Sequence, residues 1–303
     1  MFNAPGRFYR GNLHTHSTNS DGVKSPQEVC EAYAAEGYDF ISLTDHFIGL
    51  YDYPITDCSP FHTNQFTTIL GAELHSGAQE NGAIWHILAV GLPADFTPSN
   101  SPTFFANDDQ ESGPEIAQRA RDAGAFVAIA HPHWSVLTLD DARSLKAAHA
   151  VEVYNHGCGV ESDRGYGTHT LDQLLSEGQK LTLCATDDAH FATADHFGGW
   201  VMVKAEENTA EALLEALKNG FHYSTQGPEF TNITVVGDKV HVECSEVTTV
   251  IVSGSVPQTD VVFGDGITSA EVPLGRLQNS PWVRVTLIDK DGNRAWSNPI
   301  WFD

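Results

Sequence analysis

Short apolar runs alternate with amphipathic segments along residues 1–228. The apolar runs predict strands at 9–14, 39–44, 67–73, 84–91, 125–131, 151–154, 181–186 and 199–204. The amphipathic segments predict helices at 26–36, 113–123, 139–148, 169–177 and 208–219. Strands that alternate with helices usually pair in parallel, so we expect an α/β fold. With this many units, we expect the sheet to close into a barrel.

The first predicted helix has a clear start. Ser25 and Glu28 have the spacing of a capping box, and Pro26 suits the first helical turn. Gly37 suits the C-terminal end. We therefore expect this helix to begin just after Ser25.

The pattern changes after the segment Gln226-Gly227-Pro228. No helical periodicity follows, and the later apolar runs alternate as strands do, at 231–236, 239–244, 248–253, 282–288 and 295–301. The segments 253–260 and 289–293 read as ordinary loops. We expect a first domain at 1–228 and a small antiparallel β-sandwich domain at 229–303, which we interpret as a packing or oligomerisation module.

Charge limits the class of partner. The 303 residues include 16 Lys and Arg against 40 Asp and Glu, which gives a formal net charge of −24. A chain this acidic lacks the basic surface of a nucleic-acid binder or of a protein that binds anionic membranes. A small anionic substrate stays possible, because bound metal would offset the charge locally.

Cysteine use suggests a reducing compartment. The five cysteines are odd in number, far apart and without a CxxC pair. We interpret them as reduced and mostly buried thiols of a cytoplasmic protein. We see no signal peptide at the N-terminus, and no apolar window approaches the ~20 residues of a membrane helix.

Histidines and carboxylates gather at the ends of the apolar runs. These candidates are His14, His16, Asp21, Asp45, His46, Glu73, His75, His86, His131, His133, Asp187, Asp188 and His190. Imidazole and carboxylate are ligands that divalent ions prefer. Because functional groups collect at the carboxyl ends of parallel strands, the pattern predicts one polynuclear metal centre and a hydrolase.

The residues alone leave several assignments open. His14 and His16 are two apart on a predicted strand and so project to one face, although such a pair also occurs at ordinary polar strand ends. Either Asp45 or His46 suits a metal. His75 and His86 compete for one position, and His131 and His133 pose the same ambiguity.

The order of these motifs resembles the PHP (polymerase and histidinol phosphatase) superfamily of metal-dependent phosphoesterases. The resemblance covers residues 9–228 and rests on His-x-His, Asp, Thr-Asp-His, Glu, His, His-Pro and Asp-x-His in that order. The segments GYDFISLTDHF, AIAHPHW, VEVYNHG and ATDDAHF, with a C-terminal β domain, are most similar to its carbaryl-hydrolase-like branch.

The resemblance implies a distorted (β/α)7 barrel that holds two or three divalent ions, commonly Mn, Fe or Zn. One ion would take His14, His16, Glu73 and Asp188. A second would share Glu73 and take His86 and His131. A third would take Asp21, His46 and His190. His75, His133 and Asp187 would lie beside the ligands or the substrate, and Asp45 would orient a ligand.

The function we predict is hydrolysis of a small phosphorylated metabolite or nucleotide by a hydroxide that bridges the ions. His190 or His133 would protonate the leaving group. Arg164, in the Gly-rich loop at 155–168, is our preferred residue to hold the phosphate.

Two other functions are compatible with the sequence. The first is hydrolysis of carboxylic or carbamate esters by the same centre. The few arginines favour it, as do the aromatic residues Trp85, Trp134, Phe191 and Trp200. The second is a non-catalytic metal-binding module, which a complete set of ligands disfavours.

Overall fold

The computed structural model describes residues 1–255 and 257–302 of the chain. Its helices are α1 (Pro26–Ala35), α2 (Gly113–Asp122), α3 (Leu139–Ser144), α4 (His156–Ser162), α5 (Thr168–Ser176) and α6 (Ala210–Lys218), with short 3₁₀ turns at Gly49–Tyr51 and Ser59–Phe61. The strands of the first part are β1 (Arg7–Asn12), β2 (Phe40–Leu43), β3 (His46–Phe47), β4 (Thr67–Ala78), β5 (Ile84–Val90), β6 (Phe126–Ile129), β7 (Ala150–Asn155), β8 (Thr182–Thr186), β9 (Trp200–Ala205) and β10 (His222–Thr225). The C-terminal strands are β11 (Phe230–Val236), β12 (Lys239–Gly254), β13 (Thr259–Pro273), β14 (Trp282–Ile288), β15 (Arg294–Trp296) and β16 (Ile300–Trp301).

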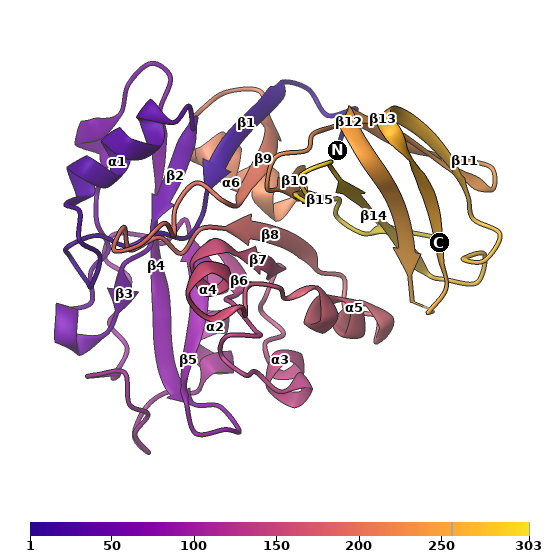
Figure 1. Cartoon of the computed structure of the whole chain (residues 1–303). Helices are drawn as coiled ribbons and strands as arrows, with labels where there is room; N and C mark the ends of the chain where they lie inside the picture. Colours follow the sequence, from indigo (N-terminus) through magenta and orange to yellow (C-terminus); the bar gives the residue numbers. More distant parts are fainter. Residues whose placement is uncertain (256, 303) are drawn as a thin grey trace.

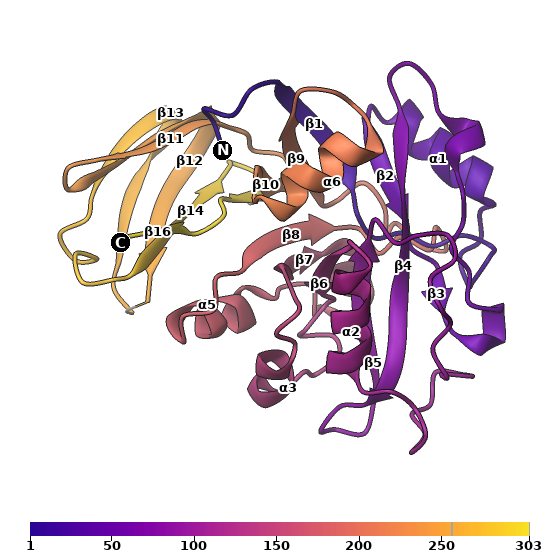
Figure 2. The same cartoon turned by 180° about the vertical axis from the view of Figure 1, so that it is seen from behind.

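The fold is mixed α/β around one large sheet (Figures 1 and 2). The paired strands follow the order β11-β12-β14-β15-β10-β9-β1-β2-β4-β5-β6-β7-β8. Strand β8 lies beside β9 and β10, although in the described residues it does not pair with either as part of the sheet. The α/β class predicted from the sequence is therefore correct.

The parallel pairing expected from the alternation of strands and helices holds for only some strand pairs of the first part. Strands β1, β2 and β4 pair in parallel, as do β6, β7 and β8. By contrast, β5 is antiparallel to both β4 and β6, and β9 is antiparallel to β1. The link between β4 and β5 at 79–83 is too short for a parallel crossover, so it forms a hairpin.

Buried strands place the chemistry-bearing residues. All four residues of β2 and of β6 are buried, and each strand ends two residues before a candidate, at Asp45 and His131. Strand β8 ends just before Asp187. Because apolar side chains fix these strands in the core, the polar residues that follow are held at one edge of the sheet.

Two helices show what local sequence does and does not decide. As predicted, α1 begins after Ser25, whose hydroxyl accepts a hydrogen bond from the Glu28 amide in a complete capping box. The segment 155–168, predicted as a loop, instead contains α4. Two glycines lower the helix propensity of α4, and the side chain of Asn155 caps it by accepting from the Cys158 amide.

The C-terminal part contains only strands among its described residues after α6. The predicted runs 239–244 and 248–253 form one strand, β12, with a register shift after Glu243. The loop predicted at 253–260 is shorter than expected, because β12 extends to Gly254 and β13 begins at Thr259. Position 256 of that loop lies outside the described residues. Most side chains of β13 are partly or fully exposed, so no apolar pattern revealed it.

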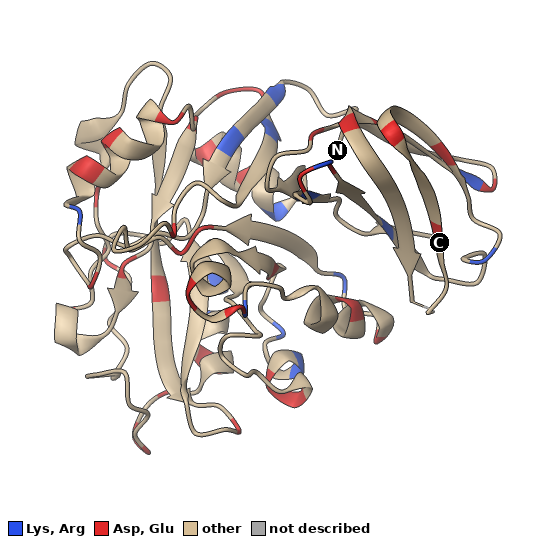
Figure 3. Cartoon of the chain, in the orientation of Figure 1, with Lys and Arg blue, Asp and Glu red and all other residues tan. Residues whose placement is uncertain are grey.

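The C-terminal strands continue the sheet of the first part. Strand β10 pairs with β15, and Tyr223 of β10 packs into the same apolar cluster as residues of β11, β12 and β14. The domain boundary after residue 228 and the two-sheet sandwich stay predictions. Acidic residues are spread over both parts (Figure 3). Within the described residues, no helix combines the length and the apolar character that crossing a membrane requires.

Candidate metal centre

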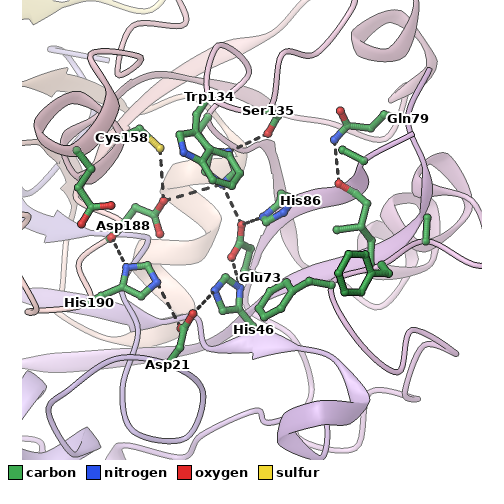
Figure 4. A pocket seen from close by; sticks show the side chains of 18 of the residues that line it. Asp21, His46, Glu73, Gln79, His86, Trp134, Ser135, Cys158, Asp188 and His190 are labelled. Carbon is green, nitrogen blue, oxygen red and sulfur yellow. Dashed lines mark hydrogen bonds and ion pairs between the residues drawn. The ribbon is translucent and has the colours of Figure 1, made fainter. Parts of the chain in front are cut away.

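The structure brings the predicted metal ligands together from distant parts of the chain. Several of them point toward one another beside an open cavity (Figure 4). Five groups place their ligand atoms within 4.8 Å of one another. These groups are His16, Asp21, His46 and His190; His14, His16 and Glu73; His14, His131 and Asp188; His46, Glu73 and His75; and Glu73, His86 and His131.

Glu73 lies at the middle of the cluster and is fully buried. Its Oε1 is 2.8 Å from His86 Nδ1 and 3.0 Å from His131 Nε2. Its Oε2 is 2.6 Å from His46 Nδ1 and 3.6 Å from His14 Nε2, yet among the described residues it has no partner with hydrogen-bond geometry. A carboxylate with imidazoles around both oxygens is suited to bridge two cations.

Several histidines are oriented by a second partner on the other ring nitrogen. The Nδ1 atoms of His14, His131 and His190 lie 2.7 Å from Glu152 Oε1, 3.0 Å from Ser135 Oγ and 3.0 Å from the Asp188 carbonyl oxygen. Metal-binding histidines usually donate this second N–H to such an acceptor, which fixes the tautomer. Each Nε2 is thereby left to face the cluster.

The protonation preferences of the cluster conflict with one another when no ion is bound. Burial and the neighbouring charges of His46 and His190 lower the pKa of His16 to about 3. Burial works against charge at His46 as well, but Glu73 and Asp21 raise its pKa to about 10. Asp21 and Asp188 similarly outweigh burial and raise the pKa of His190 to about 9.

The ring of His16 lies too close to those of His46 and His190 for all three to be protonated together. The ring centroid of His16 is 4.2 Å from that of His46 and 4.2 Å from that of His190. A divalent ion replaces such protons and binds neutral imidazole.

His75 joins the cluster through strand geometry. It follows Glu73 by two residues on β4, and it lies opposite His86 on β5. Its Nδ1 is 3.0 Å from the Trp85 carbonyl oxygen, and its Nε2 is 2.8 Å from His46 Nδ1. Sequence reasoning treated His75 and His86 as competitors, but the hairpin places both against Glu73. The sequence signal for this was the spacing of two residues between Glu73 and His75 on one strand, followed by a short link to the strand that carries His86.

The remaining alternatives are resolved by contacts. The carboxylate of Asp45 accepts hydrogen bonds from the Ser17 amide at 2.7 Å and from the Ser20 hydroxyl at 2.7 Å. Asp45 therefore braces the turn beside His16, while His46 enters the cluster. Asp187 accepts hydrogen bonds from the backbone amides of residues 197–199 and braces that loop instead.

Two predicted residues are not brought to the centre. His133 and Arg164 are both exposed, and neither lines the cavity beside the cluster. His133 follows the buried pair His131-Pro132 but turns outward, and Arg164 follows the end of α4 at Asp163, which has a left-handed backbone. The proposed roles of both in catalysis stay predictions without support from this geometry.

Glu152, which is not among the predicted metal ligands, also contacts the cluster. The structure shows that its carboxylate accepts from the His131 amide at 2.6 Å and from the Thr186 hydroxyl at 2.7 Å, besides contacting His14. Glu152 is fully buried on β7. The run Val-Glu-Val indicated that Glu152 would be buried. A buried carboxylate requires several hydrogen-bond partners, which pointed to a position beside other polar groups.

A cavity of about 910 Å³ opens beside the cluster. Aromatic side chains of Phe104, Phe105 and Trp134 line it, and Phe105 is 78% exposed. Helix α4 contributes Cys158 and Glu161. None of the described lining residues is Lys or Arg. Residues 104–106 belong to the long segment that connects β5 to α2.

The residues present fit divalent ions. Two of the buried atoms at the centre, His14 Nε2 and Glu73 Oε2, have no hydrogen-bond partner among the described residues. Leaving such groups unpaired costs about 1–3 kcal/mol each. A set of imidazoles and carboxylates with lone pairs directed at shared points suits Mn, Fe or Zn.

Comparison with known proteins supports the fold. A scan against protein-family models found no match, and a search of curated proteins found no significant match. The chain is similar to the crystal structure of a two-domain protein from Bacteroides vulgatus that contains a predicted PHP-like metal-dependent phosphoesterase. The TM-score is 0.52 at 16% identity, over 98% of this chain and 97% of that one. This confirms the predicted resemblance to the PHP superfamily at the level of the fold.

A second structure is less similar. It is an amidohydrolase from Chromobacterium violaceum with bound sulfate and no metal, with a TM-score of 0.40 at 16% identity over 59% of this chain and 87% of that one. A TM-score this low says nothing about the function of this chain. The carbaryl-hydrolase-like branch stays a prediction.

Proposed function

We propose that this protein is a metal-dependent hydrolase that cleaves ester bonds, with a small phosphoester as its first candidate substrate. The observation that supports this most is the convergence of oriented imidazole nitrogens around Glu73 beside an open cavity. Divalent ions bound there would acidify a water molecule and neutralise negative charge in the transition state. Two or three ions are compatible with the ligand groups.

The residues of the chain would hold and orient this chemistry. Glu152 and Ser135 fix the rings of His14 and His131, so their Nε2 atoms stay directed inward. His190 borders the cavity with a side chain 27% exposed, and its Nε2 is 3.3 Å from Asp21 Oδ1. When this nitrogen is not a ligand, it is placed to donate a proton to a leaving group.

One observation favours a second candidate, the carboxylic or carbamate ester hydrolase. The described lining of the cavity has aromatic rings and no Lys or Arg. A substrate with several negative charges would therefore find its counter-charge only at the ions. A neutral ester would lose nothing by this and would gain apolar contact with Phe104 and Trp134.

We further propose the finer architecture that the sequence suggested. Residues 1–228 would form a distorted (β/α)7 barrel, supported by the return of β8 to β9 and β10. Residues 229–303 would form a separate β-sandwich domain, supported by an apolar cluster to which their strands contribute most of the buried residues. The acidic composition supports a small-molecule substrate rather than a nucleic-acid polymer or a membrane, and the reduced cysteines support a cytoplasmic location.

The first experiment compares p-nitrophenyl phosphate, bis-p-nitrophenyl phosphate and p-nitrophenyl acetate with Mn-loaded protein. We expect phosphoester turnover that chelator abolishes and that Mn restores. Glu73→Gln should lose it together with bound metal, whereas Glu36→Gln, at an exposed position outside the centre, should behave as the wild type.

The outcomes separate the two candidates. Turnover of acetate without turnover of either phosphoester would replace the phosphoesterase by the neutral-ester hydrolase. Turnover that survives both complete metal removal and Glu73→Gln would contradict the proposed centre.

A further inference from the structure

A second cavity, of about 360 Å³, lies where the segment before α5 meets the C-terminal strands. Its floor is one face of the sheet. Ser253 of β12 lies opposite Arg284 of β14, and Ile288 of β14 lies opposite Arg294 of β15. Residues directly opposite on neighbouring strands share a face, and so do residues two apart. The two arginines therefore project from the same face into one cavity.

The wall of the cavity comes from the first part of the chain. Tyr166 and Thr168 line it, and Tyr166 forms a β-bridge with Tyr154. Asp172 of α5 accepts two hydrogen bonds of 2.7 Å from Arg284, which ties the helix to the sheet. Figures 1 and 2 both show α5 beside the part of the sheet that holds β14. The cavity is thus held from both sides.

The cavity carries positive charge in a strongly acidic chain. None of its described lining residues is Asp or Glu. Asp172 neutralises Arg284, but Arg294 donates only to neutral oxygens, at 3.1 Å to the Tyr166 hydroxyl and at 3.3 Å to the Gly292 carbonyl. In the described part of the chain, no carboxylate lies within ion-pair distance of Arg294. The charge of Arg294 is therefore left without a carboxylate partner in the described lining of the cavity.

We propose that this cavity is a binding site for a small oxyanion, a phosphate or a carboxylate, separate from the metal centre. Arg294 would supply the charge, because guanidinium donates paired hydrogen bonds that match both anions. The hydroxyls of Ser253 and Thr168 would supply further donors. The volume is that of a small-metabolite site. This proposal does not rest on the proposed hydrolase activity.

The test measures binding of inorganic phosphate to metal-loaded protein by isothermal titration calorimetry. We expect two classes of site, one at the ions and one at the cavity. Arg294→Gln should weaken the second class by about tenfold or more and leave the first unchanged. Arg276→Gln is the matched control, because that side chain is 70% exposed on the same part of the chain and outside the cavity.

Crystals soaked in selenate then locate the anion by anomalous scattering. A peak beside Arg294 that Arg294→Gln removes, with Arg276→Gln unchanged, would establish the site. Ser253→Ala, which keeps the Arg294–Tyr166 contact, should weaken phosphate less. Titration with benzoate distinguishes a planar carboxylate from a tetrahedral anion. The proposal is wrong if neither the titrations nor the selenate soaks detect an anion at the cavity. It is also wrong if Arg294→Gln binds phosphate as the wild type does.

Discussion

At the scale of single residues, the centre depends on which nitrogen of each ring carries a proton. His14 illustrates this most clearly. Its Nδ1 contacts Glu152 at 2.7 Å, and its fully buried Nε2 has no hydrogen-bond partner in the described residues. Burial opposes charge on His14, but Asp188 and Glu152 hold its pKa well above the ordinary value. A metal ion satisfies the same carboxylates without the proton.

We expect His14→Ala to lose bound metal and hydrolytic activity together, because it removes a nitrogen that no neighbouring side chain replaces. Elemental analysis of purified protein and turnover of the best p-nitrophenyl ester measure both. His169→Ala is the control, since His169 is exposed outside the cavity. A His14→Ala protein with full metal content and full activity would show that the ligand assignment is wrong.

At the scale of elements, strand alternation and strand ends account for most of the cluster. His14 and His16 follow β1, and Glu73 and His75 share one face of β4. The β4–β5 register adds His86 opposite His75. The helices serve these strands by covering them. Helix α1 buries Val29, Cys30 and Tyr33, and the Tyr33 hydroxyl donates to Asp187 at 2.8 Å.

A substitution at the start of α1 shows whether the stability of this helix affects the metal centre. Ser25→Ala removes the hydroxyl that accepts from the Glu28 amide, and we expect it to lower the free energy of unfolding by about 1 kcal/mol. Urea unfolding measures this change. Gln27→Ala, exposed on the same helix, should change stability by less than about 0.5 kcal/mol. Metal content should be unchanged in both, and a loss of metal in Ser25→Ala would show that the helix start supports the centre.

At the scale of the whole molecule, the sheet curls until β10 contacts β8. His222 of β10 makes this contact, because its Nε2 donates to the Leu183 carbonyl at 3.0 Å. The side chain is fully buried. Burial lowers the pKa of His222 from 6.5 to about 4, so the folded protein keeps this ring neutral.

This depressed pKa predicts a pH dependence of stability. Below pH 6.5 the unfolded chain binds a proton at His222 that the folded state does not accept until about pH 4. Stability from this residue is therefore fully present above pH 6.5 and is lost as the pH falls toward 4. The loss amounts to roughly 3 kcal/mol over that window.

Urea unfolding of the wild type and of His222→Gln at several pH values measures this contribution as a difference, in which the other histidines cancel. We expect the difference in unfolding free energy to shrink by roughly 2–3 kcal/mol from pH 7 to pH 4.5. His133→Gln should leave the pH dependence unchanged. Parallel curves for the wild type and His222→Gln would mean that His222 is already accessible to protons in the folded state.

Most strands and helices of residues 1–228, the start of α1 and the residue types of the centre could be predicted from the sequence alone. Apolar periodicity, helix caps and strand ends each depend on residues close together in the sequence, so they can be predicted from it. For the same reason, two elements that lack a local signal were not predicted. The propensity of α4 is low, and β13 lacks an apolar face, so only their long-range partners define them.

Only the tertiary structure decided which candidates meet. His131 and His133 lie two residues apart after the same strand, yet one is buried against Glu73 and the other is exposed. His75 and His86, competitors in the sequence, both enter the centre because the hairpin aligns them. The cavity between α5 and the C-terminal strands brings together residues more than 80 positions apart. Such contacts depend on how the elements pack, which no local pattern specifies.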